Sequence, residues 1–280
     1  MKSNHFLYIL AILFFQMTSC QKQSGIDYSL YELKFEDNFD GNQLDLTKWA
    51  YRTDNKHRSV QLKENVEIGN GYLTLHLKQL SQPLDGKLAT GAGIVSRERF
   101  RYGYYEVRAK LGNGIDSDQD GEIDEGWHHS FWAMAAEIDG DEVATTYPGI
   151  RRTEIDCFEN SSEHGEDPGQ KGLNRFTQHV IIWNEKGKEV GRLPKPPADL
   201  TRIKDFQAID WHTYAFEWTD ETLRFFVDGK ETHSTSYSAS EYEHDYINVW
   251  LTAISANWNK EGAEDSQAIY DYFRYYSFKK

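Results

Sequence analysis

The stretch Tyr104-Tyr105-Glu106-Val107-Arg108-Ala109-Lys110-Leu111 decides the fold class. Its odd-numbered positions are apolar or aromatic, and its even-numbered positions after Tyr104 are charged. A period of two is the pattern of a β-strand with one buried face. We therefore expect Tyr104, Glu106, Arg108 and Lys110 to face water.

The same pattern of short strands and turns continues along the chain. Asn70-Gly71 and Asp228-Gly229 are two-residue hairpin signals. Helical periodicity over ten or more residues is not evident, and a turn is indicated near Ser238–Glu243. Further strands are expected at 66–68, 73–77, 214–218, 223–227, 247–254 and 269–278. Many short strands separated by turns predict a single all-β domain, a sandwich or jelly roll.

Composition narrows the classes of function. The 280 residues carry 31 Lys+Arg against 45 Asp+Glu, a formal net charge of −14, which argues against nucleic acid as a partner. Aromatic residues make up 14% of the chain, and this abundance favours strands. The two cysteines indicate a core that needs no disulfide, with Cys157 as a small buried apolar residue.

Residues 1–19 indicate an export signal. The apolar run Phe6–Phe15 is too short to span a bilayer, which takes about 20 residues. Met17-Thr18-Ser19 before Cys20 resembles a lipobox, which implies acylation of Cys20 and a tether over residues 20–30. We therefore expect an envelope protein at the outer membrane or cell surface, attached to the membrane only through its lipid. Ordinary secretion with a free Cys20 is the alternative.

The carboxylate-rich segment Glu154-Ile155-Asp156-Cys157-Phe158-Glu159 carries the chemistry. In a regular strand, Glu154 and Asp156 share a face and Glu159 points the other way. A β-bulge at Cys157-Phe158 would absorb one residue and return Glu159 to the face of the other two acids. We expect at least one of three acids at this spacing to stay protonated near neutral pH.

Two interpretations of this segment stay open from the residues alone. With the bulge, the outer carboxyl groups would approach the separation of about 5–5.5 Å found in retaining glycosidases, in which one acid attacks and the other protonates the leaving oxygen. The alternative is a solvated acidic strand face, since short acidic alternations are common.

The setting of the motif resembles glycoside hydrolase family 16, whose bulged catalytic strand carries Glu-(Ile/Leu/Val)-Asp-x-x-Glu. The resemblance runs through nearly the whole mature chain. The matching segments are Phe35–Gly41 with Leu44, Asp45 and Trp49, then Gly71–Leu75, Tyr102–Arg108, Phe131–Met134, His179 with Trp183, Phe216–Trp218, Val227–Gly229 and Tyr270–Tyr276.

This resemblance implies a curved, concanavalin A-like jelly roll, with residues 31–280 as the catalytic domain and a cleft along its concave face. It implies Glu154 as nucleophile, Asp156 as an assisting acid and Glu159 as general acid/base. His179 would be a neighbour on the adjacent strand. No cofactor would be required for the chemistry.

Flat aromatic rings and hydrogen-bonding groups are expected in a cleft that binds several sugar units. Trp132 matches a cleft-lining residue of the family, and Trp127, Trp183, Trp250 and Trp258 are further candidates, each with a place in the core as the alternative. His128 and His129 could form hydrogen bonds with sugar hydroxyls, or they could cap a loop. Strand alternation places Arg152 on the face of Glu154, where it could pair with a substrate sulfate or carboxylate, or with the acids themselves.

The loop Asp116-Ser117-Asp118-Gln119-Asp120-Gly121-Glu122-Ile123-Asp124 resembles the first nine positions of a calcium loop. Its acidic candidates are Asp116, Asp118, Asp120, Glu122 and Asp124. The closing Glu is missing, because Trp127 stands at position 12. We expect a structural Ca²⁺ here, with a solvated acidic turn as the alternative. A second calcium site on the convex side, at Asp271, is a further expectation.

Three classes of function follow. The leading prediction is a monomeric, retaining, endo-acting glycoside hydrolase that cleaves a β-linked polysaccharide. The alternatives are a non-catalytic glycan-binding lipoprotein on the same fold and a purely structural lipoprotein. The substrate stays open between laminarin-type β-glucan and algal galactans, and Trp127–Trp132 departs from the Trp-Pro-Ala-Phe-Trp run of many laminarinases.

Overall fold

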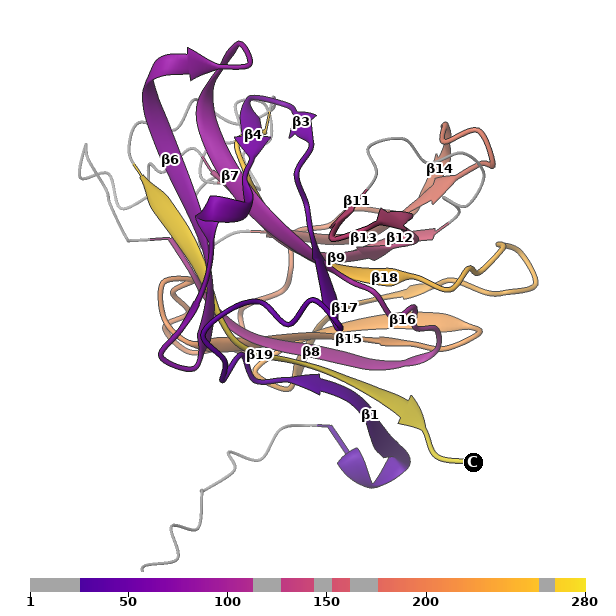
Figure 1. Ribbon diagram of the computed structural model, residues 1–280. Helices are drawn as coiled ribbons and strands as arrows, with labels where there is room; N and C mark the ends of the chain where they lie inside the picture. Colours follow the sequence, from indigo (N-terminus) through magenta and orange to yellow (C-terminus); the bar gives the residue numbers. More distant parts are fainter. Residues whose placement is uncertain (1–25, 113–126, 144–152, 162–175, 257–264) are drawn as a thin grey trace, which may run out of the picture.

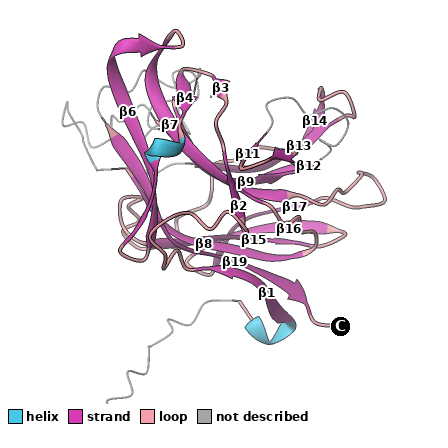
Figure 2. Cartoon of the chain, viewed as in Figure 1, coloured by secondary structure: helices cyan, strands magenta, loops and turns pink. Residues whose placement is uncertain are grey.

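The computed structural model describes residues 26–112, 127–143, 153–161, 176–256 and 265–280. The regular elements in these ranges are β-strands and two single-turn 3-10 helices, η1 Tyr28–Leu30 and η2 Lys63–Asn65 (Figure 2). The strands form two packed layers (Figure 1). Within the same ranges, no helix is long and apolar enough to cross a membrane. The predicted all-β sandwich is therefore confirmed.

The first layer holds the acidic motif at β12. β12 pairs antiparallel with β9 and β13, and further antiparallel pairs join β9 to β18, β18 to β7, β7 to β2 and β13 to β14. The strands of this layer are β2 Trp49–Tyr51, β7 Lys87–Ser96, β9 His128–Met134, β10 Ile138–Asp139, β11 Glu142–Val143, β12 Thr153–Ser161, β13 Phe176–Trp183, β14 Glu189–Arg192 and β18 Asn248–Ile254.

The second layer is centred on β8, which pairs with β15 and β19. The long strand β6 pairs with β19 at one end and with β7 at the other, so it joins the two layers. The strands of this layer are β1 Tyr31–Asp37, β5 Val66–Gly69, β6 Tyr72–Leu84, β8 Gly103–Leu111, β15 His212–Trp218, β16 Thr222–Val227, β17 Lys230–Ser236 and β19 Ser266–Phe278, and the short strands β3 Asn55–Lys56 and β4 Ser59–Gln61 pair beside β7.

The main core lies between the layers and is rich in aromatic rings. Phe131 of β9 contacts Phe216 of β15, with ring centroids 5.7 Å apart. Phe158 of β12 contacts Tyr214 of β15 at 4.6 Å. All four side chains are fully buried. Burying a large apolar side chain contributes about 1.5–3 kcal/mol, so these contacts fix the acidic strand on the second layer.

Both predicted hairpin turns are confirmed. Asn70 and Gly71 have φ of 56° and 79°, and Asp228 and Gly229 have φ of 49° and 70°. Two consecutive residues with positive φ are typical of the type I′ turns that connect twisted strands. The turn expected near Ser238–Glu243 is present, where Tyr242 N donates to Ser238 O.

The prediction that one side of β8 faces water is wrong for Tyr104 and Glu106. Both are at most 4% exposed, because η1 and β1 cover this face. The Tyr28 hydroxyl donates to Glu106 Oε2 at 2.7 Å, and its ring contacts Tyr104. Ile26, within the segment predicted as a tether, packs against the buried cluster that contains Tyr104.

The backbones of β7 and β18 approach each other closely at Gly91, and this packing can be tested by substitution. A Cβ at Gly91 would meet the Ala253 carbonyl oxygen at 2.4 Å, whereas a Cβ at Gly191 in β14 meets nothing nearer than 3.6 Å. We expect Gly91→Ala to lower the free energy of unfolding by about 1–3 kcal/mol, the usual cost of overpacking. Urea denaturation of both variants checks this, and an equal effect of Gly91→Ala and Gly191→Ala would contradict the described packing.

Candidate active site

The predicted bulge in β12 is present. Asp156 and Glu159 pair with His179 and Thr177 of β13, so three steps on β12 match two on β13. The register with β9 shifts between Asp156 and Phe158. Cys157 and Phe158 are both fully buried in the core, and burial raises the pKa of the Cys157 thiol. Because Cys157 and Phe158 both face the core, Glu159 points away from the core, on the same side of the strand as Glu154 and Asp156.

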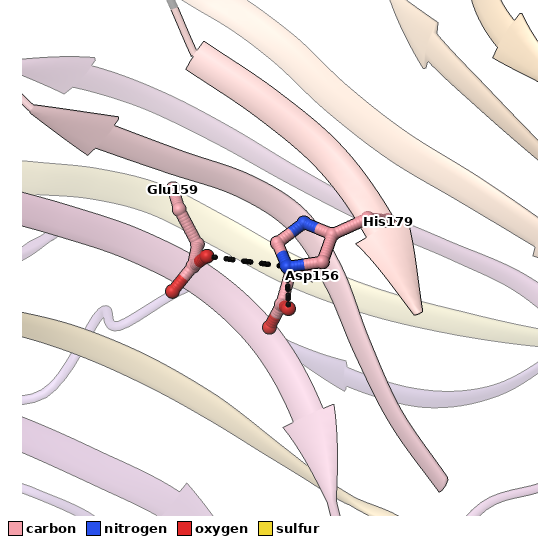
Figure 3. Close-up of side chains that lie close together, drawn as sticks. All are labelled: Asp156, Glu159 and His179. Atoms are coloured by element: carbon pink, nitrogen blue, oxygen red, sulfur yellow. Dashed lines mark ion pairs between the residues drawn. The ribbon is translucent and has the colours of Figure 1, made fainter. Parts of the chain in front are cut away.

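The face of the first layer that points away from the core is called here the site face. Asp156, Glu159 and His179 lie close together on it (Figure 3). His179 lies opposite Asp156 on β13, as expected. Its Nε2 lies 3.2 Å from Asp156 Oδ2 and 3.7 Å from Glu159 Oε2. Asp156 and His179 are fully buried, and Glu159 keeps 21% of its side chain exposed. Glu159 is therefore the member of this cluster that a substrate can reach.

The two acids on either side of the bulge differ in proton affinity. Burial, together with the nearby charges of Glu159 and Glu154, raises the pKa of Asp156 well above its ordinary value. Burial also acts to raise the pKa of Glu159, but the hydrogen bond from His128 and the positive charges around it lower that pKa to about 2. The expectation of one protonated acid thus falls on Asp156, and Glu159 is ionised in the free protein.

His179 is held neutral by its surroundings. Burial, followed by the positive charges of Lys195 and Arg192, lowers its pKa to about 4 despite the opposing effect of Glu159. Arg192 Nη1 lies 3.2 Å from His179 Nε2, and the rest of its guanidinium forms a forked pair with Glu189. A neutral imidazole can accept from the guanidinium at Nε2. Arg192 therefore fixes the orientation of the histidine that contacts Asp156.

Two tryptophans complete the site face near Glu154. Trp183, at the end of β13, donates its indole N–H to Glu154 Oε2. Trp132 stacks on Trp250 with centroids 4.5 Å apart and an interplanar angle of 21°. Trp132 is partly exposed, and Trp250 is buried beneath it. The pair offers a supported flat ring of the kind that the apolar face of a sugar can contact.

The structure corrects two predicted substrate-binding residues. Trp127 and His129 lie on the core side of the first layer and are completely buried, so neither can contact a sugar. Strand alternation explains the error, because Phe131 of the same strand also points into the core. The site face instead receives His128, whose Nε2 lies 3.2 Å from Glu159 Oε1.

Other predicted residues lie outside the described ranges. These are Arg152, Trp258, the lipidation candidate Cys20 and the calcium-loop residues Asp116, Asp118, Asp120, Glu122 and Asp124. The convex-side candidate Asp271 is described, and its carboxylate pairs with Arg108 at 2.6 Å. That pairing gives Asp271 a partner other than calcium.

A metal ion is a second possibility for the His179 cluster. One ligand atom each from Asp156, Glu159 and His179 lies within 4.8 Å of the others. The guanidinium of Arg192 lies against the same imidazole nitrogen that would bind the ion, and its positive charge opposes a second cation. The arrangement therefore suits proton chemistry better than metal binding.

The sequence reasoning named His128 of β9 as a candidate without separating it from His129, and it missed Arg192 of β14. Placing His128 on the site face needed only the alternation His128, Ser130, Trp132, which was available in the sequence. Arg192 carried no comparable signal, because its approach to His179 depends on how β14 pairs with β13.

The lowered pKa of His179 predicts acid sensitivity. Below about pH 6.5 the unfolded chain takes up a proton that the folded protein cannot bind until about pH 4, so stability falls as the pH falls through this window. The loss from His179 is about 3 kcal/mol. His233 and His244 also have lowered pKa values, and the comparison with His179→Gln separates their contribution. We expect a smaller loss in this variant between pH 6.5 and 4 by urea denaturation, and an equal loss would contradict the assignment.

Comparison with known proteins agrees with this geometry. The family model described as "Beta-porphyranase A-D, GH16 domain" matches residues 32–277. A curated beta-porphyranase B of Phocaeicola plebeius is 26% identical over 279 residues, which cover 86% of this chain and 82% of the relative. A kappa-carrageenase of Pseudoalteromonas carrageenovora is 26% identical over 220 residues, 72% of this chain and 50% of that protein.

Solved structures share the fold. The crystal structure of porphyranase B from Zobellia galactanivorans superposes with a TM-score of 0.68 at 20% identity, covering 89% of this chain and 94% of that one. A laminarinase catalytic domain from Thermotoga petrophila gives 0.63 at 18% identity, covering 89% and 99%. The sandwich is thus the jelly roll of these glycanases. With a family model matching nearly the whole described domain, the chain belongs to glycoside hydrolase family 16.

Proposed function

We propose that the protein is a retaining, endo-acting hydrolase that cleaves a sulfated β-linked galactan of the porphyran type. The observation that carries the proposal is the bulge in β12, which brings Glu154, Asp156 and Glu159 to one face beside a partly exposed tryptophan. The match to the porphyranase family model supports the choice of substrate.

Glu154 is the proposed nucleophile. Its carboxylate oxygen attacks the anomeric carbon while the bond to the leaving sugar oxygen breaks and Glu159 gives that oxygen a proton. The indole N–H of Trp183 holds Glu154 in place. Asp156, whose raised pKa keeps it protonated, stands between the two glutamates without adding a third negative charge.

Glu159 must gain a proton before it can act as an acid. Its pKa is low in the free protein because of His128 and the surrounding positive charges, although burial already opposes this. A sugar that covers the exposed part of Glu159 would remove more water and raise its pKa further. Protonated Asp156, which has a carboxylate oxygen within 4.8 Å of one of Glu159 and shares His179 as a neighbour, is the proposed proton source.

The second step releases the product. A water molecule gives a proton to Glu159 and attacks the anomeric carbon, and the ester bond to Glu154 breaks. The two inversions leave the configuration of the sugar unchanged. The carboxylates are the only reacting groups that this mechanism draws from the protein.

Substitution of the two glutamates tests the proposed mechanism. We expect Glu159→Gln to lower kcat by about 10²–10⁴-fold, the usual contribution of a general acid and base. Glu154→Gln should abolish turnover and leave glycan binding intact, since the amide cannot attack. Reducing-end release from a panel of sulfated and neutral galactans and laminarin gives the rates, and NMR of fresh product gives its anomeric configuration.

Several outcomes would overturn this proposal. Inverted product would exclude the double displacement, and unchanged turnover of Glu154→Gln would remove the nucleophile. Cleavage of laminarin in preference to galactans would assign the other predicted substrate. Binding without cleavage of any glycan by the unmodified protein would leave a non-catalytic glycan-binding protein.

We also propose that the protein is held in the cell envelope by a lipid on Cys20. The apolar run before Met17-Thr18-Ser19-Cys20 supports this proposal. Cys20→Ala in the full chain should move the protein from the membrane fraction to the soluble fraction, as detected by immunoblot. Equal distribution of the variant and the unmodified protein would contradict the anchor.

A further inference from the structure

The edge of the first layer beside the acids carries two cations. The chain turns at Asn184–Lys188, continues as β14 and then runs alongside β13. Leu193 N donates to Val180 O, and Ala198 N donates to Phe176 O. These contacts place the segment Leu193–Ala198, called here the edge segment, next to the stretch of β13 that contains His179.

Arg192 and Lys195 reach the acids from this edge. Arg192 contacts His179 Nε2 at 3.2 Å. The backbone contacts of the edge segment place Lys195 beside the stretch of β13 that contains His179. Its positive charge acts to lower the pKa of Asp156, Glu159 and His179. The cations therefore stand beside the bond-breaking groups, within a chain whose net charge is −14.

The two cations differ in what they bind. Arg192 is occupied by Glu189 and His179. Lys195 is half-buried, and no ion pair joins it to another described residue. An ammonium that has no carboxylate partner in the described part of the protein can form an ion pair with an anionic group of a ligand. Lys195 is thus the cation available to an incoming group.

Electrostatics favours an anionic ligand for this position. Ionised Glu159, together with the overall negative charge of the chain, repels a polyanion as it approaches. A sulfated polysaccharide can enter only where a local positive charge offsets that repulsion. The edge segment supplies such a charge on the side of the acids that borders β13.

We propose that Lys195, supported by Arg192, forms an anion subsite that binds a sulfate ester on a sugar unit next to the scissile bond. This inference rests on the proposed function and deepens it by naming the residue that binds the sulfate. The alternative is that Lys195 only lowers the pKa values of the acids. Its loss would then affect sulfated and sulfate-free substrates equally, whereas the loss of an anion subsite would affect the sulfated substrate more.

Binding in the inactive Glu154→Gln protein separates these roles. Dissociation constants are measured by calorimetry for an oligosaccharide of the sulfated galactan and for the same oligosaccharide after removal of its sulfate esters. We expect Lys195→Gln to weaken binding of the sulfated ligand by about tenfold more than binding of the sulfate-free ligand. High salt should reduce this difference, because the ion pair between Lys195 and the sulfate would be partly exposed to solvent.

Lys188→Gln is the matched control. It removes the same charge from an exposed position of the same hairpin, where the backbone of Lys188 bonds to Asn184 through its N–H and its carbonyl oxygen. We expect this variant to bind both ligands as the parent does. Thermal unfolding of both variants verifies that each is folded.

The outcomes separate this inference from the proposed function. If the unmodified protein cleaves the galactan but Lys195→Gln weakens both ligands equally or neither, the anion subsite is wrong and the hydrolase assignment stands. An equal loss in Lys188→Gln would also overturn the subsite, since it would reflect overall charge. If the unmodified protein cleaves no galactan, the proposed function fails by a separate measurement.

Discussion

The site depends on one backbone constraint, the extra residue at Cys157-Phe158. Both side chains are fully buried, and Phe158 packs against rings from the second layer. Because the core accepts two consecutive inward residues, Glu159 emerges on the face of Glu154 and Asp156. The hydrophobic contacts that stabilise the sandwich therefore also set the alignment of the acids. A one-residue change of register would place Glu159 in the core, where an ionised group is costly.

The second constraint is the distribution of protons among groups that cannot all be charged. Burial leaves Asp156 protonated and His179 neutral, while His128 and the nearby cations keep Glu159 ionised. Arg192 orients His179 from the neighbouring strand. The site thus holds a protonated Asp156 beside an ionised Glu159, the arrangement on which the proposed mechanism depends.

Much of the fold and site could be predicted because the information is local. Period-two patterns, two Asn/Asp-Gly turns and the doubled apolar pair in the acidic motif predicted strands, hairpins and the bulge. Features that depend on distant segments could not be predicted. Glu106 is buried by Tyr28, far away in the sequence, and Arg192 reaches His179 only through the pairing of β14 with β13. Trp127 and His129 were placed on the wrong face although the alternation of β9 was available.

Detection of the covalent intermediate tests the central claim most directly. Glu159→Gln protein, in which the base for the second step is missing, is mixed with a glycosyl fluoride of the substrate sugar, whose leaving group needs no proton from Glu159. The mixture is quenched in acid, digested and examined by mass spectrometry. The account predicts a glycosyl group esterified to Glu154 within the peptide that contains the bulge. Turnover without any adduct, or an adduct on another carboxylate, would contradict the alignment of acids on which the mechanism rests.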